Sequence, residues 1–302
     1  MGVYVGVSGM PPPQYVRTKL GMTARSDCVA DLVFDVGFHK GEDSAYYLAK
    51  GYRVIAFEAN PALVLTGRLR FAREIRDGRL TVVEGAISGS DAPAVRFYCH
   101  PNTVWGTTEE SWARRNLVLA GSEPVDVPVV DFAGVLAASG MPHYMKLDIE
   151  GAGRHCLQTL RSFKQRPTFV SIESEQEDWD KLEAEFWLLE ELGYDRFAVL
   201  QQATIPGTRI RTLRIDGQPL VFEFEDHSSG PFGLEVSPWL TRQEALARYR
   251  RVFLGYRVLG PNSWIRRTKL GRGLRGQAAK YAGRPLPGWY DTHATRSLTI
   301  GA

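Results

Sequence analysis

The chain has 302 residues, of which 44% are hydrophobic and 24% charged, and its net charge is +3. These values are typical of a soluble globular protein with one large or two ordinary domains, and they exclude a disordered chain, a collagen-like repeat and a membrane bundle. No stretch approaches ~20 uninterrupted apolar residues, and the first residues lack the pattern of a signal peptide. We therefore expect a cytoplasmic protein without a membrane span.

The first ninety residues alternate between strand and helix patterns. Residues 1–30 are rich in Gly and Pro and are expected to form an N-terminal arm, with one short strand at 3–7. Short apolar runs then predict buried strands, and segments with helical spacing lie between them: strands at 31–36, 53–58 and 79–86, helices at 44–51 and 61–76. This alternation indicates parallel strands joined by right-handed crossovers.

The alternation continues toward the C-terminus. Further patterns predict strands at 143–149, 168–173, 195–201 and 220–225, and helices at 153–164, 177–192 and 241–253. Two more strands, at 94–98 and 125–130, belong to an insertion over 88–125. We expect an α/β domain over 31–240, with five parallel strands followed by two late ones. A basic C-terminal helix and tail, 241–302, would pack on this domain or on a partner.

Basic residues concentrate in the last part of the chain. Thirteen Lys/Arg and two Asp/Glu lie from Arg242 onward, against 24 basic and 32 acidic residues before it. Such a tail could bind nucleic acid, anionic lipid or a phosphorylated substrate. It could instead fold back on the acidic body or simply be solvated, and this is favoured because the basic residues are scattered among Gly, Pro and Trp. The three cysteines form no CxxC pair, which indicates buried thiols rather than a disulfide framework or a zinc site.

Glycines and acids follow the first two predicted strands. The first turn contains Asp35, Gly37, His39 and Gly41, and Glu58 ends the second strand. Ligands of open α/β sheets bind at such strand ends, and an acid placed like Glu58 can accept hydrogen bonds from a ribose diol. The turn is GxxxG rather than GxGxxG, and two acids follow it, which disfavours a pyrophosphate. S-adenosylmethionine (SAM), which has a ribose but no phosphate, fits this pattern.

Four segments, in this order between Phe34 and Ala152, resemble the FkbM family of SAM-dependent methyltransferases: DVGFHKGEDS, VIAFEANP, VVEGAIS and MKLDIEGA. FVSIESE, SSGPFG at 228–233 and WYDTHA at 289–294 are similar to further motifs of the family or of some members. The resemblance implies a Rossmann-like class I methyltransferase sheet of seven strands, mostly parallel with the last antiparallel, and helices on both faces. Phe38 replaces a small residue of the usual turn, which would narrow the pocket.

The resemblance also implies the roles of individual residues. The methionine end of SAM would lie near Asp35, Gly37 and Gly41, and His39 would approach the ligand from the turn. Asp148 and Glu150 would lie beside the transferred methyl group. The ribose would lie on Glu58, and the adenosine beside the residues Ala59, Asn60, Ala86 and Ile87. The family transfers methyl groups to hydroxyls of sugars, glycans and natural products, leaving S-adenosylhomocysteine (SAH). We therefore expect an O-methyltransferase acting on a small-molecule or saccharide acceptor.

An alcohol acceptor needs a general base or a metal, because its hydroxyl is a weak acid. The candidate catalytic residues are Asp148, Glu150, Glu173 and His227, with His143 as a further base. Asp148 is favoured because it ends the fourth parallel strand, although it could also cap the following helix. A divalent metal on Asp148, Glu173 and His227 is allowed but not favoured, since no close ligand spacing supports it.

Other functions stay open at this point. The basic tail allows a nucleic-acid-associated methyltransferase or binder, but no NPPY-like motif and no interleaved basic and aromatic stripe supports it. A non-catalytic nucleotide-binding protein is a third alternative. The insertion and residues 203–302 would form the acceptor pocket, where Trp105 could stack on adenine or a sugar. The sequence identifies no acceptor, and a homodimer is compatible with its aromatic tail.

Overall fold

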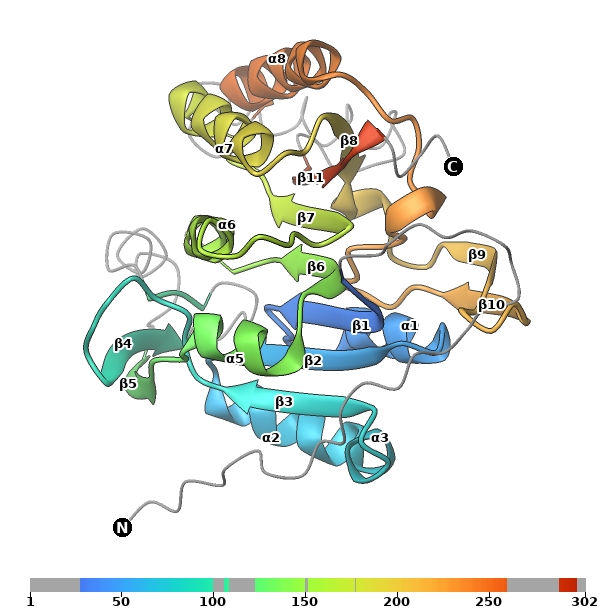
Figure 1. Ribbon diagram of the computed structural model, residues 1–302. Helices are drawn as coiled ribbons and strands as arrows, with labels where there is room; N and C mark the ends of the chain where they lie inside the picture. The colour runs from blue at the N-terminus through green and yellow to red at the C-terminus, as the bar shows by residue number, and fades with distance from the viewer. Residues whose placement is uncertain are drawn as a thin grey trace, which may run out of the picture.

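The computed structural model describes residues 28–99, 106–108, 123–149, 152–176, 178–259 and 288–297. Its centre is a seven-stranded sheet in the order β3-β2-β1-β6-β7-β11-β8, with helices on both faces (Figure 1). The strands are β1 (Val29–Val36), β2 (Arg53–Glu58), β3 (Leu80–Glu84), β6 (Pro142–Leu147), β7 (Phe169–Glu173), β8 (Arg196–Gln201) and β11 (Tyr290–Thr295). Neighbouring strands are parallel except at β11, which runs antiparallel to both β7 and β8. The predicted fold class is confirmed.

The central strands are apolar on both faces because helices cover both sides of the sheet. In β1, Leu32 and Phe34 pack into one core cluster, and Val33 between them packs into the opposite one. The first cluster lies under α5 (Phe132–Ser139), α6 (Gly153–Leu160), α7 (Trp179–Glu191) and α8 (Arg242–Leu259). The second face is covered by α1 (Glu42–Ala49), α2 (Pro61–Arg70) and α3 (Ala72–Arg76) (Figure 1).

Two helical segments differ from their predictions. The helix expected over 61–76 is two helices, because the backbone leaves the helical region at Phe71, between α2 and α3. Helix α5 was not predicted. It begins where the Asp131 side chain accepts a hydrogen bond from the Gly134 N–H at 2.8 Å, which caps the helix.

The predicted strand at 220–225 is not part of the central sheet. It corresponds to β10 (Pro219–Glu223), which pairs with β9 (Arg209–Leu213) in a separate two-stranded hairpin. Exposed and half-buried residues alternate along both strands, as expected for a hairpin with one face in solvent. The insertion contains a second hairpin of β4 (Ala94–Cys99) and β5 (Glu123–Pro128), close to the predicted strands. Trp105, the N-terminal residues 1–27 and residues 260–287 of the tail lie outside the described residues.

The seventh strand of the sheet comes from the segment that the sequence analysis assigns to the tail. β11 lies between β7 and β8, although it is largely polar and buried. Hydrogen bonds make this possible: Thr292 Oγ1 bonds to Ser174 Oγ at 2.6 Å and to the Tyr249 hydroxyl at 2.8 Å. Ser174 also donates to Glu185 on α7, whose pKa is raised to about 8 by burial. Within the described part of the chain, no helix combines the length and apolar character needed to cross a membrane.

Candidate cofactor and active site

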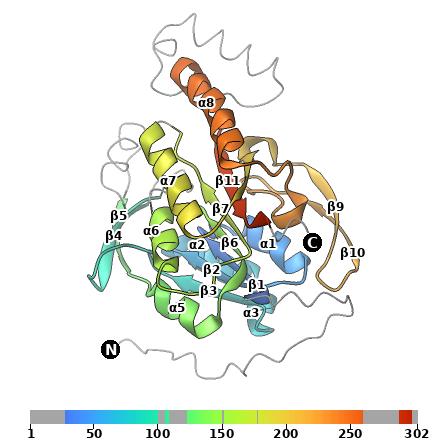
Figure 2. The same cartoon turned by 45° about the horizontal axis from the view of Figure 1, so that its top comes forward.

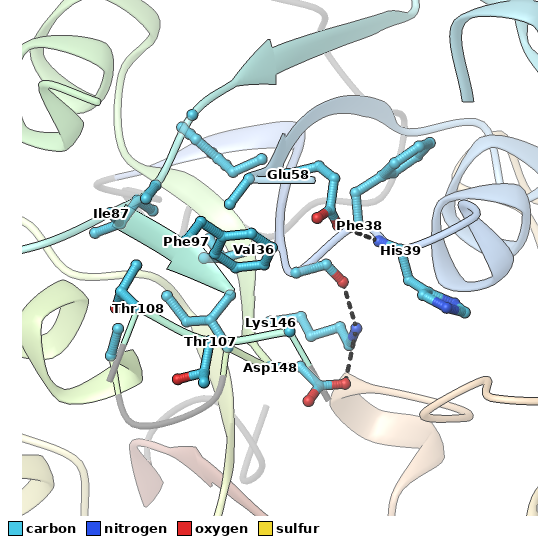
Figure 3. A pocket seen from close by; sticks show the side chains of 18 of the residues that line it. Val36, Phe38, His39, Glu58, Ile87, Phe97, Thr107, Thr108, Lys146 and Asp148 are labelled. Atoms are coloured by element: carbon cyan, nitrogen blue, oxygen red, sulfur yellow. Dashed lines mark hydrogen bonds and ion pairs between the residues drawn. The ribbon is translucent and has the colours of Figure 1, made fainter. Parts of the chain in front are cut away.

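A cavity opens at the carboxyl ends of β1, β2, β3 and β6 and reaches the β4–β5 hairpin (Figure 3). It holds about 920 Å³ of empty space, its open mouth included. Eight residues of the predicted site line it: Gly37, His39, Glu58, Ala59, Ala86, Ile87, Asp148 and His227. Residues from five separate parts of the sequence therefore meet at the edge where the sheet was expected to bind its ligand.

The turn after β1 is shaped by a close approach of two strand ends. Gly37 has φ +93°, and a Cβ at this position would lie 1.9 Å from the Asp148 carbonyl oxygen. The Asp148 N–H donates to the Val36 carbonyl at 2.8 Å, which fixes the two segments side by side. A glycine is needed here because the backbone of Asp148 leaves no room for a side chain. This contact also sets the position of Asp148 over the cavity.

Phe38 borders the cavity, but its ring is directed to one side of it. Its ring is 2% exposed and packs against Phe71, with ring centroids 6.0 Å apart. A Cβ on Gly67 of α2 would lie 2.1 Å from this ring, so the absence of a side chain at Gly67 accommodates the larger residue. The aromatic side chain thus lies away from the polar centre of the cavity, as Figure 3 shows.

Glu58 ends β2 with its carboxylate held by two backbone donors. The N–H groups of His39 and Asn60 each donate to one carboxylate oxygen at 2.8 Å. Burial nevertheless raises the pKa of Glu58 above its ordinary value, and these hydrogen bonds offset only part of that effect. Each carboxylate oxygen keeps a further lone pair for a ligand in the cavity. The turn after β1 and the end of β2 are thereby locked to each other.

Lys146, near the end of β6, is the centre of the buried charges. Its side chain is 4% exposed, and its ammonium lies 3.0 Å from Asp43, 3.2 Å from Asp148 and 3.6 Å from Asp35. Burial raises the pKa of Asp35 to about 7, although the nearby ammonium opposes this shift. The three carboxylates raise the pKa of Lys146, so the lysine stays charged despite its burial. When Lys146 and the three aspartates are all ionised, this cluster carries more negative than positive charge, which favours a cationic ligand.

Two histidines lie at the side of the cavity nearest α1. The rings of His39 and His227 meet edge to face, with centroids 5.5 Å apart. His39 Nδ1 is 2.9 Å from a carboxylate oxygen of Glu42. Burial would raise the pKa of Glu42, but hydrogen bonds from His39 and from the Lys40 N–H hold it below its ordinary value. Both histidines have positive φ, which the surrounding turn and loop impose.

Several predicted site residues lie elsewhere. Asp35 is buried below the cavity, Gly41 and Asn60 begin α1 and α2 as their N-caps, and Glu173 pairs with Asp291 in the sheet. Glu150 lies outside the described residues.

The structure contradicts a role for His143 as base, because this residue lies near the start of β6, stacked on Tyr52. In the described ranges no three His, Cys, Asp or Glu residues are placed to hold a metal, so Asp148, Glu173 and His227 do not assemble into a metal site.

The sequence analysis missed Lys146 and Asp43. A lysine inside an otherwise apolar strand was an available signal, because a buried lysine needs acidic partners. It also missed Asp291, which is 1% exposed and accepts a hydrogen bond from Gln202. Burial raises the pKa of Asp291 to about 8, and the charge of Asp148 adds to this shift. Asp291 pairs with Glu173, the last residue of β7, and so lies at the same edge of the sheet as Asp148.

A sheet in this strand order, with its last strand antiparallel and a glycine turn and an acid at the ends of β1 and β2, defines a class I methyltransferase fold. The chain belongs to the FkbM methyltransferase family: the Methyltransferase FkbM domain matches residues 35–196, more than half of the chain. It is a SAM-dependent methyltransferase. No curated protein matches it.

Solved methyltransferase structures resemble the chain at low identity. A precorrin-6y C5,15-methyltransferase from Geobacter metallireducens is 11% identical, with 89% of this chain and 81% of that chain covered and a TM-score of 0.36. An O-methyltransferase from Bacillus cereus in complex with SAH is 12% identical, with 64% and 72% covered and a TM-score of 0.34. A SAM-dependent methyltransferase from Geobacter sulfurreducens in complex with SAH is 13% identical, with 88% and 85% covered and a TM-score of 0.33.

Proposed function

We propose that the protein transfers the methyl group of SAM to a hydroxyl of a sugar, glycan or natural product in the cytoplasm. The observation that carries this proposal is Glu58. Its carboxylate is fixed by two backbone N–H groups and borders the cavity, where it offers two acceptor oxygens to the hydroxyls of a ribose. Ala59, Ala86 and Ile87 supply the apolar walls beside it for an adenine ring.

The charges of the cavity fit the other end of SAM. Three aspartates surround the single ammonium of Lys146, and Asp35 Oδ1 is buried without a hydrogen-bond partner among the described residues. A cationic ligand compensates this unbalanced negative charge, whereas an anionic phosphate would be repelled. Bound SAM supplies a methyl group activated by its positively charged sulfur.

The reaction then requires a group that accepts the hydroxyl proton while the new O–C bond forms and the S–C bond breaks. Of the predicted catalytic residues, Asp148 and His227 line the cavity. We assign the proton acceptor to Asp148, because Lys146 orients its carboxylate from 3.2 Å and the side chain is still 28% exposed toward the cavity. His227 lies in the loop that the Ser229 N–H anchors to Asp43 at 2.8 Å.

Calorimetric titration with SAH tests the cofactor site. We expect binding by the wild-type protein and a loss of roughly a hundredfold in Glu58→Ala, because two hydrogen bonds to a charged group disappear. Glu84→Ala is the matched control: Glu84 ends the neighbouring strand in register with Glu58 but pairs with Arg68. Absence of SAH binding by folded wild-type protein would overturn the proposal.

A second experiment tests the chemistry. The protein is incubated with methyl-labelled SAM and a panel of hydroxylated sugars and natural products, and transfer is followed by label in the product. For an acceptor found in this way, Asp148→Asn should lower kcat by 10²- to 10⁴-fold while SAH affinity changes little. An unchanged kcat would remove Asp148 from the role of base.

A further inference from the structure

Helix α8 presents a cationic face to solvent. Ala245, Leu246 and Tyr249 are buried against the body of the protein, whereas Arg250, Arg251 and Arg257 are exposed. Within the described residues none of these three arginines makes an ion pair, although Arg250 lies 5.7 Å from the ring of Trp179. Leu254, which lies on α8 between Arg251 and Arg257 in the sequence, is 61% exposed. The face therefore combines unpaired positive charge with an exposed apolar side chain.

This helix ends at the catalytic edge of the sheet. The Tyr256 hydroxyl donates to the Gly288 carbonyl, which joins the end of α8 to the residue before Trp289. β11 starts directly afterwards, where Tyr290 pairs with Gln201 at the end of β8. The carboxyl ends of β7 and β8 lie at this edge, as does that of β6, which is followed by Asp148. Figure 2 shows α8 rising from the body of the protein beside β11.

Trp289 adds a second exposed apolar group at the same end, since it is 48% exposed. Arginines beside an exposed Leu are typical of surfaces that bind at a lipid–water interface, where exposed Trp side chains are also enriched. A polynucleotide would also attract the arginines, but it offers no apolar environment for Leu254. The sequence of residues 260–287, which follow the helix, holds seven Lys/Arg and no Asp/Glu, with Trp264, Ile265 and Leu270 among them.

We propose that Arg250, Arg251, Leu254, Arg257 and Trp289, here called the α8 surface, dock the protein on an anionic lipid bilayer. The arginines contact lipid phosphates, and Leu254 and Trp289 enter the interface. Docking in this way turns the catalytic edge toward the bilayer, so that the acceptor hydroxyl is presented at the membrane. The orientation of the acceptor rests on the proposed function, but lipid binding itself does not.

Vesicle co-sedimentation tests the docking directly, without cofactor or acceptor. Vesicles of phosphatidylcholine alone are compared with vesicles that contain phosphatidylglycerol, at low and at physiological salt. We expect binding only to the anionic vesicles and weaker binding as salt rises. Each arginine at an anionic bilayer strengthens binding about fivefold, so the triple change Arg250→Gln, Arg251→Gln, Arg257→Gln should weaken it roughly a hundredfold.

Two further variants separate this surface from net charge. The matched triple change Arg76→Gln, Arg209→Gln, Arg211→Gln removes the same charge from exposed arginines elsewhere and should leave binding within about threefold of wild type. Leu254→Ser, which keeps all charges, should weaken binding severalfold. Equal losses in the two triple variants, no effect of Leu254→Ser, no binding to anionic vesicles, or tighter binding to an oligonucleotide than to the vesicles would each overturn the proposal. SAH titration of the α8 variants should be unchanged, which distinguishes failure of docking from failure of the cofactor site.

Discussion

Replacing Lys146 with Met should show how much the buried charge cluster depends on one ammonium. Three carboxylates lie 3.0–3.6 Å from its nitrogen, and Asp35 and Asp43 are almost fully buried. Removing one partner of a buried ion pair leaves uncompensated charge and costs about 3–5 kcal/mol. Met keeps the apolar stem and the volume, so the loss comes mainly from the charge. We expect the free energy of unfolding of Lys146→Met to fall by this amount at about pH 8.

The loss should depend on pH in a defined direction. Burial already raises the pKa of Asp35 to about 7, and loss of the ammonium raises it further. A carboxyl with a raised pKa in the folded state favours folding while it is protonated, and this contribution is lost as pH rises through that pKa. The cost of Lys146→Met should therefore be at least about 1 kcal/mol smaller near pH 5.5 than near pH 8, which corresponds to about one pKa unit.

Urea unfolding followed by circular dichroism at the two pH values measures both quantities. Lys164→Met is the control, because Lys164 is exposed on the surface, and it should change the free energy of unfolding by less than about 0.5 kcal/mol. A cost below about 1 kcal/mol for Lys146→Met, or an equal cost at both pH values, would refute the reasoning that the cluster depends on this charge.

Three further substitutions test other parts of the structure. Glu185→Gln removes a buried carboxyl whose pKa is about 8 and should raise the free energy of unfolding by about 3 kcal/mol near pH 7.5, with a smaller gain near pH 5, as measured by urea unfolding. Gly67→Ala places a Cβ against the Phe38 ring and should cost about 1–3 kcal/mol; Phe38→Leu should relieve most of this cost in a double-mutant cycle, and additive effects would contradict the contact. Asp131→Ala removes the N-cap of α5 and should lower thermal stability by about 1 kcal/mol, and no change would contradict the capping role.

The apolar strands could be predicted from the sequence, whereas the polar one could not. β1, β2, β6, β7 and β8 are buried on both faces and therefore appear as short apolar runs, within a few residues of their observed ends. β11 is stabilised by hydrogen bonds of Thr292 and Asp291 to distant side chains, so no apolar run marks it. β10 was assigned to the sheet although its residues alternate in burial, a pattern that suits a hairpin with one solvated face.

The residues of the candidate site could likewise be predicted only in part. Residues recognised by their place at a strand end, such as Glu58 and Asp148, do line the cavity. Lys146 and Asp43 were missed because each depends on the other. A buried lysine is stable in the core only beside acids, and these acids come from α1 and β1. The lysine within an apolar strand is visible in the sequence, but the acids that pair with it come from distant segments and cannot be identified from its spacing.

The place of β11 in the sheet also sets the order in which the protein can be completed during synthesis. Ser174 and Thr292, which hydrogen-bond across two neighbouring strands, are 118 residues apart in the chain. Until residues 290–295 have left the ribosome, β7 and β8 have no strand between them, and their edges are open to wrong pairing. Pairing over such long separations is slow. The nascent chain therefore acquires the last interior strand of its sheet, and Asp291 at the catalytic edge, in one late step.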